Sequence, residues 1–321
     1  MIGYSKQSGL AMVIVIWVLS LLTIMAGSFA LTMRRESTVI SAVKDNAIVQ
    51  AMAETGLSFA QEMLSLPDKQ MRWHADGSIY RLNYHDAEIR VRLISEQGKI
   101  DINKASEESL TALLSSTTAE SSKQQEIVSA ILDWRDKDDE IHINGAEKEE
   151  YEDAELNYSP ANKDFQLIEE LQMVLGMNSK IYKQLKPLIT VYSKQKSVDL
   201  NVASKKVIET LVDIDPVIVD QYIQQRTNSH SDQQPAPDFP MVGVEGKKQN
   251  ENGNEVYTVI SEAQLYSDVS AGIQVTLKRS LNSEGSGFKI VSWQQIEQKQ
   301  SLFDNEMTPL LVRQNEPEDR D

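Results

Sequence analysis

The chain of 321 residues contains no cysteine, and this absence excludes disulfide bridges, thiolate metal sites and cysteine nucleophiles. Histidine is scarce as well, and the four histidines stand too far apart in the sequence to give the paired spacing of a zinc site. A glycine-rich phosphate loop and a G-x-S-x-G nucleophile motif are also absent. These absences predict that the protein is not an enzyme.

Basic residues are in the minority, since 32 lysines and arginines face 48 aspartates and glutamates and give a formal net charge of −16. A surface of this sign repels phosphate, so we do not expect nucleic acid as a partner. The same surface suits calcium ions and basic protein surfaces.

Charged residues are absent from residues 10–33, and most of this segment is large and apolar. A helix needs about 20 such residues to cross a bilayer, and it satisfies its own backbone hydrogen bonds in lipid. Arg34 and Arg35 follow directly. The segment therefore predicts one membrane-spanning helix.

Two ordinary alternatives exist for this segment. A secretory signal peptide cleaved after Ala30 fits the small residues Ser28 and Ala30, but the apolar run is longer than the usual core of about 7–15 residues. A plain signal anchor fits the length. Lys6 alone before the span, against Arg34 and Arg35 after it, leaves the topology undecided on charge counts.

The junction at Gly9 favours a third interpretation. A short polar leader ends there, and the apolar run begins at once with Leu10. The apolar periodicity of a helix then continues to Leu66, with no proline before Pro67. Such a helix would be on the order of 85 Å long, and its second half would present an apolar stripe to a globular domain. This combination resembles a type IV pilin or a type II secretion pseudopilin.

The resemblance implies that a prepilin peptidase cleaves between Gly9 and Leu10 and that Leu10 becomes an N-methylated terminus. One position departs from the common pattern, because major pilins carry glutamate at the fifth mature position and this chain has Ile14 there. A carboxylate in lipid persists only for a partner. Its absence indicates a subunit that does not dock beneath an earlier one.

Alternating apolar and polar residues predict strands on both sides of a helical block. The predicted strands cover residues 78–84, 88–94, 256–263, 271–278 and 288–293. Within the block, residues 100–106 repeat the pattern of residues 198–204, and each copy ends in a serine that can cap an amphipathic helix. The order predicts an α+β fold, in which a pilin-like long N-terminal helix packs on an antiparallel sheet and a large α-helical domain is inserted in that sheet.

A helix, a turn at Gly176 and a second helix are predicted over residues 165–185. This helix-hairpin-helix-like pattern admits an alternative function, a membrane-anchored DNA-binding or uptake receptor, because such hairpins present backbone N–H groups to phosphate. The region is acidic and lacks the basic patch that gives affinity for nucleic acid. A structural hairpin is therefore the favoured interpretation.

Carboxylates are densest in the loop of residues 133–150. Calcium takes about 6–8 oxygen ligands from carboxylates, carbonyls and water, so a loop of this composition can hold it. Asp136 and Asp138 alternate as in an EF-hand, but Ile141 stands where that loop requires glycine, so a standard EF-hand is excluded. On composition alone, a solvated acidic loop remains the alternative.

Short segments distributed over the chain form one combination. They are Asp101-Ile102-Asn103, Ile131-Leu132-Asp133-Trp134-Arg135-Asp136, Asn144-Gly145-Ala146-Glu147, Tyr151, Phe165, Glu170-Leu171, Gly176-Met177 and the closing strand that ends at Trp293. Together with Ile14 and the helical insertion, they resemble the type II secretion minor pseudopilin called general secretion pathway protein K. The resemblance implies a structural calcium ion, with the candidate ligands Asp136, Asp138, Asn144, Glu147, Glu150 and Asp153.

The same resemblance implies a subunit at the pseudopilus tip that takes part in pseudopilus assembly and in the export of folded proteins across the outer membrane. Its partners would be the other minor pseudopilins of a tip complex and the prepilin peptidase. One pass would hold the chain in the inner membrane, with the C-terminal domain in the periplasm. The expected divisions are a leader (1–9), the transmembrane part of the helix (10–33), its amphipathic continuation (34–66), the first strands of a pilin-like domain (70–98), the inserted α-helical domain (99–235), the returning strands (239–300) and an acidic disordered tail (301–321).

Overall fold

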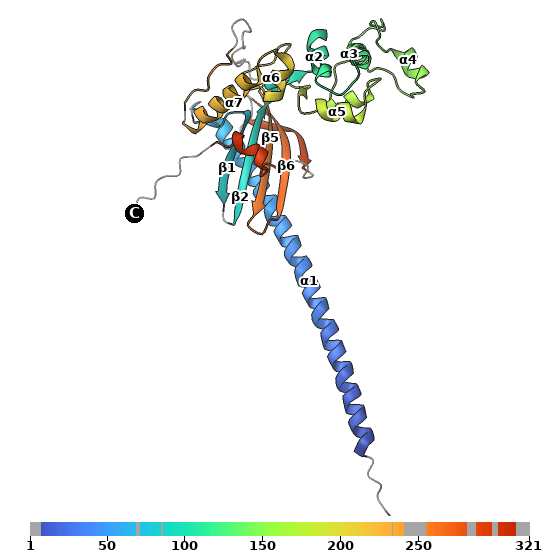
Figure 1. The fold of residues 1–321 in the computed structure, drawn as a ribbon, viewed down its shortest axis with the longest axis vertical. Coiled ribbons are helices and arrows are strands. Elements are labelled where there is room, and N and C mark those ends of the chain that lie inside the picture. Colours follow the sequence, from blue (N-terminus) through green and yellow to red (C-terminus); the bar gives the residue numbers. More distant parts are fainter. Residues whose placement is uncertain are drawn as a thin grey trace, which may run out of the picture.

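The computed structural model describes residues 8–68, 71–84, 86–232, 234–240, 255–280, 287–296 and 301–312. A long helix projects from one end of an antiparallel sheet, and a helical domain covers the other end (Figure 1). The predicted α+β fold is thereby confirmed. The helix and the sheet strands are α1 (Ser8–Ser65), β1 (Asp76–Tyr84), β2 (Ala87–Ser95), β5 (Val256–Leu265), β6 (Ser270–Arg279) and β7 (Phe288–Gln295).

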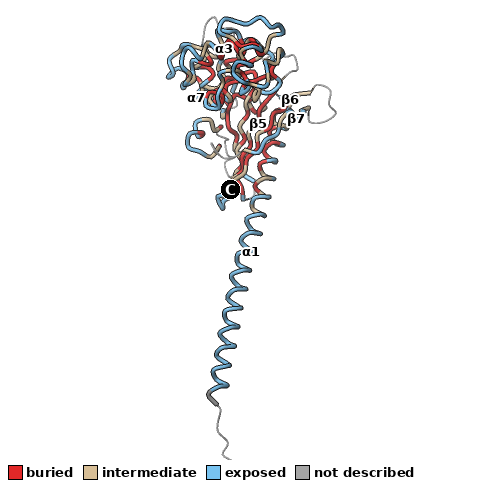
Figure 2. Tube along the Cα trace, turned by 90° about the vertical axis from the view of Figure 1, so that its right-hand side faces the viewer, coloured by how far each residue is buried: buried red, intermediate tan, exposed pale blue. Residues whose placement is uncertain are grey.

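Helix α1 has two parts with different surroundings. Its first part is exposed along its whole length, whereas its last turns are buried against the sheet (Figure 2). The buried face repeats at steps of three and four residues and consists of Val49, Ala53, Leu57, Ala60 and Leu64. Among the described residues, α1 is the one helix that is long and apolar enough to cross a membrane.

The sheet has five strands in the order β1-β2-β5-β6-β7, and all neighbours are antiparallel. Strands β2 and β5 pair along their whole length, from Ala87 opposite Leu265 to Ser95 opposite Tyr257. The chain therefore leaves the sheet after Ser95 and returns beside the same strand. The helical domain is inserted between two neighbours of one sheet, which leaves the pilin-like core intact.

The helical domain contains two similar halves. Its elements are η1 (Glu96–Gly98), β3 (Ile100–Asp101), α2 (Glu107–Ser115), α3 (Ser121–Arg135), α4 (Lys148–Asp153), η2 (Ile168–Met173), α5 (Ser179–Leu185), β4 (Ile189–Thr190), α6 (Lys205–Leu211) and α7 (Pro216–Ser231). Ser106 accepts a hydrogen bond from the Ser109 N–H, and Ser204 accepts one from the Val207 N–H. The predicted N-caps of the repeat are therefore both present.

Each half also contains an arginine that ties its second helix to the start of the repeat; Arg226 is buried and Arg135 is partly buried. Arg135 of α3 donates to the carbonyls of Ile102 (2.5 Å) and Ala105 (2.7 Å). Arg226 of α7 donates in the same way to Asn201 (2.9 Å) and Ala203 (3.1 Å). Charge-assisted bonds to carbonyls are strong in a buried site, so the two halves share one stabilising device.

The second half lies directly on the sheet. Gly98, where the chain leaves the sheet, approaches this half so closely that a β-carbon there would stand 2.7 Å from the Val202 carbonyl oxygen. The Asp199 N–H also donates to the Gln97 carbonyl oxygen (3.0 Å). The first half, with α3 and α4, lies farther from the sheet (Figure 1).

The segment of residues 301–312 is ordered, which corrects the prediction of an acidic disordered tail over 301–321. It contains the short helix η3 (Asn305–Leu310), and Leu302 and Met307 are buried. These side chains form a cluster with Ile79 on the sheet. Burial of even a few apolar side chains favours order at about 25 cal/mol per Å². Residues 313–321 lie outside the described residues.

Two charged side chains of the sheet hold the start of this segment. Glu262 accepts from the Ser301 hydroxyl (2.7 Å) and from the Leu302 N–H (2.6 Å). Arg90, opposite Glu262 in the neighbouring strand, donates to the Leu302 carbonyl oxygen (2.9 Å) and lies over the Phe303 ring. The segment ends beside edge strand β1, where the Val312 N–H donates to the Ile79 carbonyl oxygen. It thus covers one edge of the sheet.

Candidate metal site

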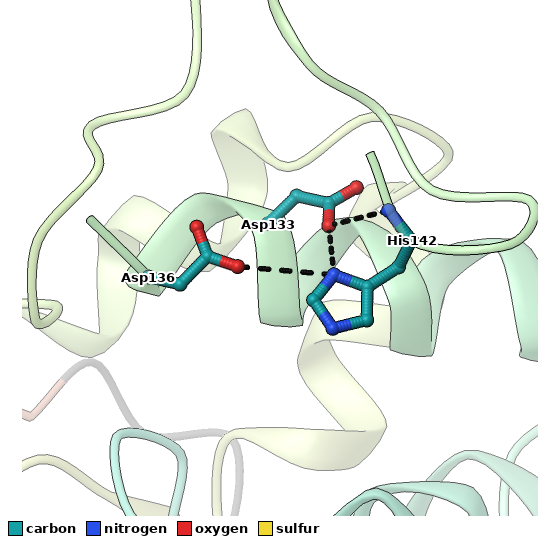
Figure 3. Close-up of side chains that lie close together, drawn as sticks. All are labelled: Asp133, Asp136 and His142. Atoms are coloured by element: carbon teal, nitrogen blue, oxygen red, sulfur yellow. Dashed lines mark hydrogen bonds and ion pairs between the residues drawn. The ribbon is translucent and has the colours of Figure 1, made fainter. Parts of the chain in front are cut away.

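Asp133 is the centre of the acidic loop. It stands in the last turn of α3, and its side chain is fully buried. Its Oδ1 accepts from the His142 N–H (3.1 Å) and contacts the His142 ring nitrogen Nδ1, while its Oδ2 accepts from the Ala146 N–H (2.6 Å). The loop that follows α3 therefore wraps around one carboxylate (Figure 3).

Asp136 lies on the same side of His142. Its Oδ2 stands 3.7 Å from His142 Nδ1, so two carboxylates face the same ring nitrogen (Figure 3). One ligand atom from each of Asp133, Asp136 and His142 can be chosen so that all lie within 4.8 Å of one another. Three ligand atoms at this separation can bind one cation.

Glu147 adds a third carboxylate with an unmet acceptor. Its side chain is nearly buried, and its Oε1 has no hydrogen-bond partner among the described residues. The same is true of Asp136 Oδ1 and Asn162 Oδ1. A buried acceptor without a partner costs about 1–3 kcal/mol, and more when it is charged. Calcium binds oxygen ligands, so these unpaired oxygens are the observation that makes the loop suitable for a cation.

The crowded carboxylates of the loop raise the pKa values of two of its acidic side chains. Burial and then the charges of Asp133 and Asp136, followed by Asp139 and Asp138, raise the pKa of Glu147 to about 7. Burial and the charges of Asp138 and Asp133 also raise the pKa of Asp136. Like charges crowd here, and a divalent cation would relieve that repulsion.

The predicted ligands take different places. Asp136 belongs to the cluster, and Glu147 lies near enough for the charges of Asp133 and Asp136 to raise its pKa. Asp138 is near enough to raise the pKa of both, although its Oδ1 accepts from the Glu140 N–H (3.1 Å). Glu150 Oε2 instead accepts from the Glu147 N–H (2.9 Å) and so caps helix α4.

The other two predicted ligands are Asn144 and Asp153, and three residues near the loop were not predicted. Asn144 forms a turn with a φ of 60°, and Asp153 is the exposed last residue of α4. Asp133, His142 and Asn162 were not predicted as ligands. Asn162 donates to the Asp139 carboxylate (2.8 Å) and thereby brings a distant segment to the loop. Asp133 lies in the last turn of α3 and Asp136 is the C-cap of that helix, so their separation of three residues at a helix end was the available sequence signal.

The predicted hairpin at Gly176 is present in altered form. Its first helix, η2, is a 3₁₀ helix, and Gly176 makes the turn with a φ of +82°. The turn packs inward, because a β-carbon at Gly176 would stand 3.1 Å from Ile127 of α3. The Leu175 N–H donates to the Tyr151 hydroxyl and the Met177 N–H to the Val174 carbonyl. Both N–H groups are thus used inside the domain.

Residues 85–194, which include the acidic loop and the first half of the helical domain, match the family model described as Type II secretion system (T2SS), protein K. The match covers about a third of the chain. The resemblance recognised in the sequence is thereby confirmed. Type II secretion system protein K of Klebsiella pneumoniae is 24% identical over 205 residues, which are 57% of this chain and 62% of that protein. The chain therefore spans less than two thirds of that relative.

Two further comparisons agree. Type II secretion system protein K of Dickeya chrysanthemi is 38% identical over 73 residues, which are 22% of this chain and 20% of that protein. A chain in the crystal structure of the GspK–GspI–GspJ complex from the enterotoxigenic Escherichia coli type 2 secretion system is similar with a TM-score of 0.54 and 19% identity. That similarity covers 82% of this chain and 99% of the other, and it shows a shared fold.

Proposed function

We propose that the protein is a minor pseudopilin of a type II secretion system, placed at the tip of the pseudopilus, where it takes part in pseudopilus assembly and in the export of folded proteins across the outer membrane. The protein K relationship of residues 85–194 supports membership of the system. The observation that supports the tip is the place of the helical domain, at the end of the sheet opposite the projecting part of α1 (Figures 1 and 2).

The geometry makes the helical domain a cap. Pilin-like subunits stack along their long helices, so the next subunit outward would need the space above the sheet. In this chain α6 and α7 occupy that space and are fixed to the sheet (Figure 1). Ile14 agrees with this position, because a subunit with nothing above it needs no carboxylate to meet a neighbour's terminal amine.

The exposed apolar part of α1 supports a single-pass anchor in the inner membrane, with the sheet and the helical domain in the periplasm. In this proposal a prepilin peptidase removes residues 1–9 after Gly9, and Leu10 becomes the methylated N-terminus. The partners are other minor pseudopilins of a tip complex. The similar Escherichia coli chain comes from a complex of three Gsp proteins, which supports that choice.

The acidic loop binds calcium in this proposal, with a structural role. Asp133, Asp136 and His142 form the cluster that would hold the ion, and Glu147, Asp138 and the Asn162 side-chain oxygen are further candidate ligands. The ion would neutralise crowded carboxylates and fix the loop between α3 and α4. A DNA receptor is not favoured, since the Gly176 turn faces α3 and two of its N–H groups are already bonded.

The test of the anchor and leader is mass spectrometry of the mature N-terminus, on full-length protein recovered from the membranes of secreting cells. A methylated Leu10 supports the proposal, whereas a start at Leu31 or an intact Met1 contradicts it. Gly9→Leu should block processing and reduce secretion. Gly3→Leu, within the same leader, is the matched control and should be processed normally.

A further inference from the structure

A buried cluster of charged side chains joins the helical domain to the sheet. Asp76 is the first residue of β1 and is almost inaccessible to solvent. His230 of α7 places Nε2 at 2.7 Å from Asp76 Oδ2, and Arg226 of the same helix places Nε at 3.0 Å from that oxygen. The two partners approach Asp76 from across the seam between the two domains, and both are also buried.

Arg226 connects three parts of the molecule. Besides the ion pair, its Nη2 donates to the Asp76 carbonyl oxygen (2.7 Å), and its Nη1 holds the Asn201 and Ala203 carbonyls of the second half. Arg135 makes the equivalent carbonyl bonds in the first half, but those bonds stay within the helical domain. Arg226 therefore differs from Arg135 in its additional contacts with Asp76, which join the helical domain to the sheet.

A second histidine lies against this cluster. His74 stacks on His230 with ring centroids 4.0 Å apart and planes 8° from parallel. The His74 N–H donates to the Tyr80 hydroxyl (2.7 Å), which fixes the backbone beside the stack. Burial, and then the charge of His230, lowers the pKa of His74 to about 4, although Asp76 opposes the shift. His74 is therefore uncharged in the folded protein near neutral pH.

Among the residues that the structure describes, the remaining charged groups around the cluster are one arginine and one carboxylate, which offset each other. Arg92 of β2 faces Asp76, Tyr80 and Tyr222 also lie near it, and Asp199 faces Arg226. His230 Nδ1 is buried without a partner among the described residues. Removing one partner from a buried ion pair costs about 3–5 kcal/mol, because an uncompensated charge remains. A proton added to His74 is costly for the same reason, because Asp76 and Asp199 already face Arg92 and Arg226 and the described part of the cluster offers no further carboxylate to balance the added charge.

We propose that Asp76, Arg226 and His230 form a latch that fixes the helical domain on the sheet, and that a proton on His74 releases it. The latch is closed when Asp76 is ionised and His74 is neutral. When His74 takes a proton beside His230, Arg226 and Arg92, the positive charges repel one another and α7 separates from β1. Acidification then frees the helical domain to move while each domain keeps its own core, because the two cores are separate clusters.

The release is measured as a distance between two spin labels on the full-length protein in detergent micelles. The chain has no cysteine, so Lys183→Cys on α5 and Lys289→Cys on β7 give two exposed, unique attachment points. We expect one narrow distance distribution at about pH 7.5 and a broad one at about pH 4, where His74 takes up its proton in the folded protein. Asp76→Asn should give the broad distribution at both pH values.

Two comparisons separate release from unfolding. His74→Phe keeps a ring to stack on His230 but cannot take a proton, so its distribution should stay narrow at both pH values. Arg226→Met should broaden the distribution, whereas Arg135→Met, its counterpart in the first half, should leave it narrow. Circular dichroism should show native helix content in every variant that is compared. A wild-type distribution unchanged by pH, acid broadening that persists in His74→Phe, or equal broadening by Arg135→Met would each overturn the proposal.

Discussion

Glu147→Gln is expected to change stability in opposite directions with and without calcium. Without calcium, the substitution removes a buried carboxylate that Asp133 and Asp136 repel. Raising the pKa from 4.5 to about 7 corresponds to about 3 kcal/mol at about 1.4 kcal/mol per pKa unit, and access of water to the loop reduces this to about 2 kcal/mol. The calcium-free variant should therefore be more stable than the wild type at neutral pH.

With calcium, the same substitution should remove stability. A ligand present at 100 times its dissociation constant stabilises the folded state by about 2.7 kcal/mol, and Glu147→Gln loses most of that gain. The assay is urea unfolding of the full-length protein in excess chelator and in excess calcium. Glu149→Gln, an exposed neighbour on α4, is the matched control and should behave as the wild type in both. Equal effects in chelator and calcium, or a wild type that calcium does not stabilise, would refute the reasoning.

Three further predictions concern the rest of the fold. Leu302→Ala should lower the free energy of unfolding by about 2 kcal/mol, because it leaves a cavity beside Ile79. Urea unfolding should show this loss, whereas Ser280→Ala, outside that cluster, should unfold as the wild type does. Gly98→Val should lower the free energy of unfolding by about 1–3 kcal/mol in the same assay, because its side chain would collide with the Val202 carbonyl. His74 gives the stability a pH dependence. The unfolded chain takes up the His74 proton near pH 6.5 and the folded chain only near 4, so the free energy of unfolding falls by on the order of 3 kcal/mol as pH falls across that window. His74→Phe should flatten this part of the stability–pH curve, and an unchanged slope would contradict it.

Local patterns predicted the elements whose signals lie within a few residues. The apolar run and its periodicity gave α1, period-two alternation gave the strands of the sheet, and the serines of the repeat gave its N-caps. These signals survive in the structure because each depends on which face of one element is buried. The acidic loop was visible for the same reason, as a local excess of carboxylates.

Contacts between distant segments were not predictable from local patterns. The segment of residues 301–312 has short apolar runs with neither helical nor strand periodicity, and it is held by Arg90 and Glu262 far along the chain. Asp133 was counted in the acidic loop but not among the candidate ligands, whereas bonds from His142 and Ala146 make it the buried centre of that loop. The ion pair of Asp76 with Arg226 crosses between two domains. No spacing rule connects such partners, because tertiary packing decides them.

The tip position is the central claim, and the position of the protein on isolated pseudopili tests it most directly. Pseudopili sheared from secreting cells are labelled with gold-conjugated antibody against the helical domain and viewed by electron microscopy, with antibody against the major subunit as the control. The account predicts label at one end of each filament, while the control decorates the whole length. Label distributed along the filaments, or pseudopili that carry none, would contradict it.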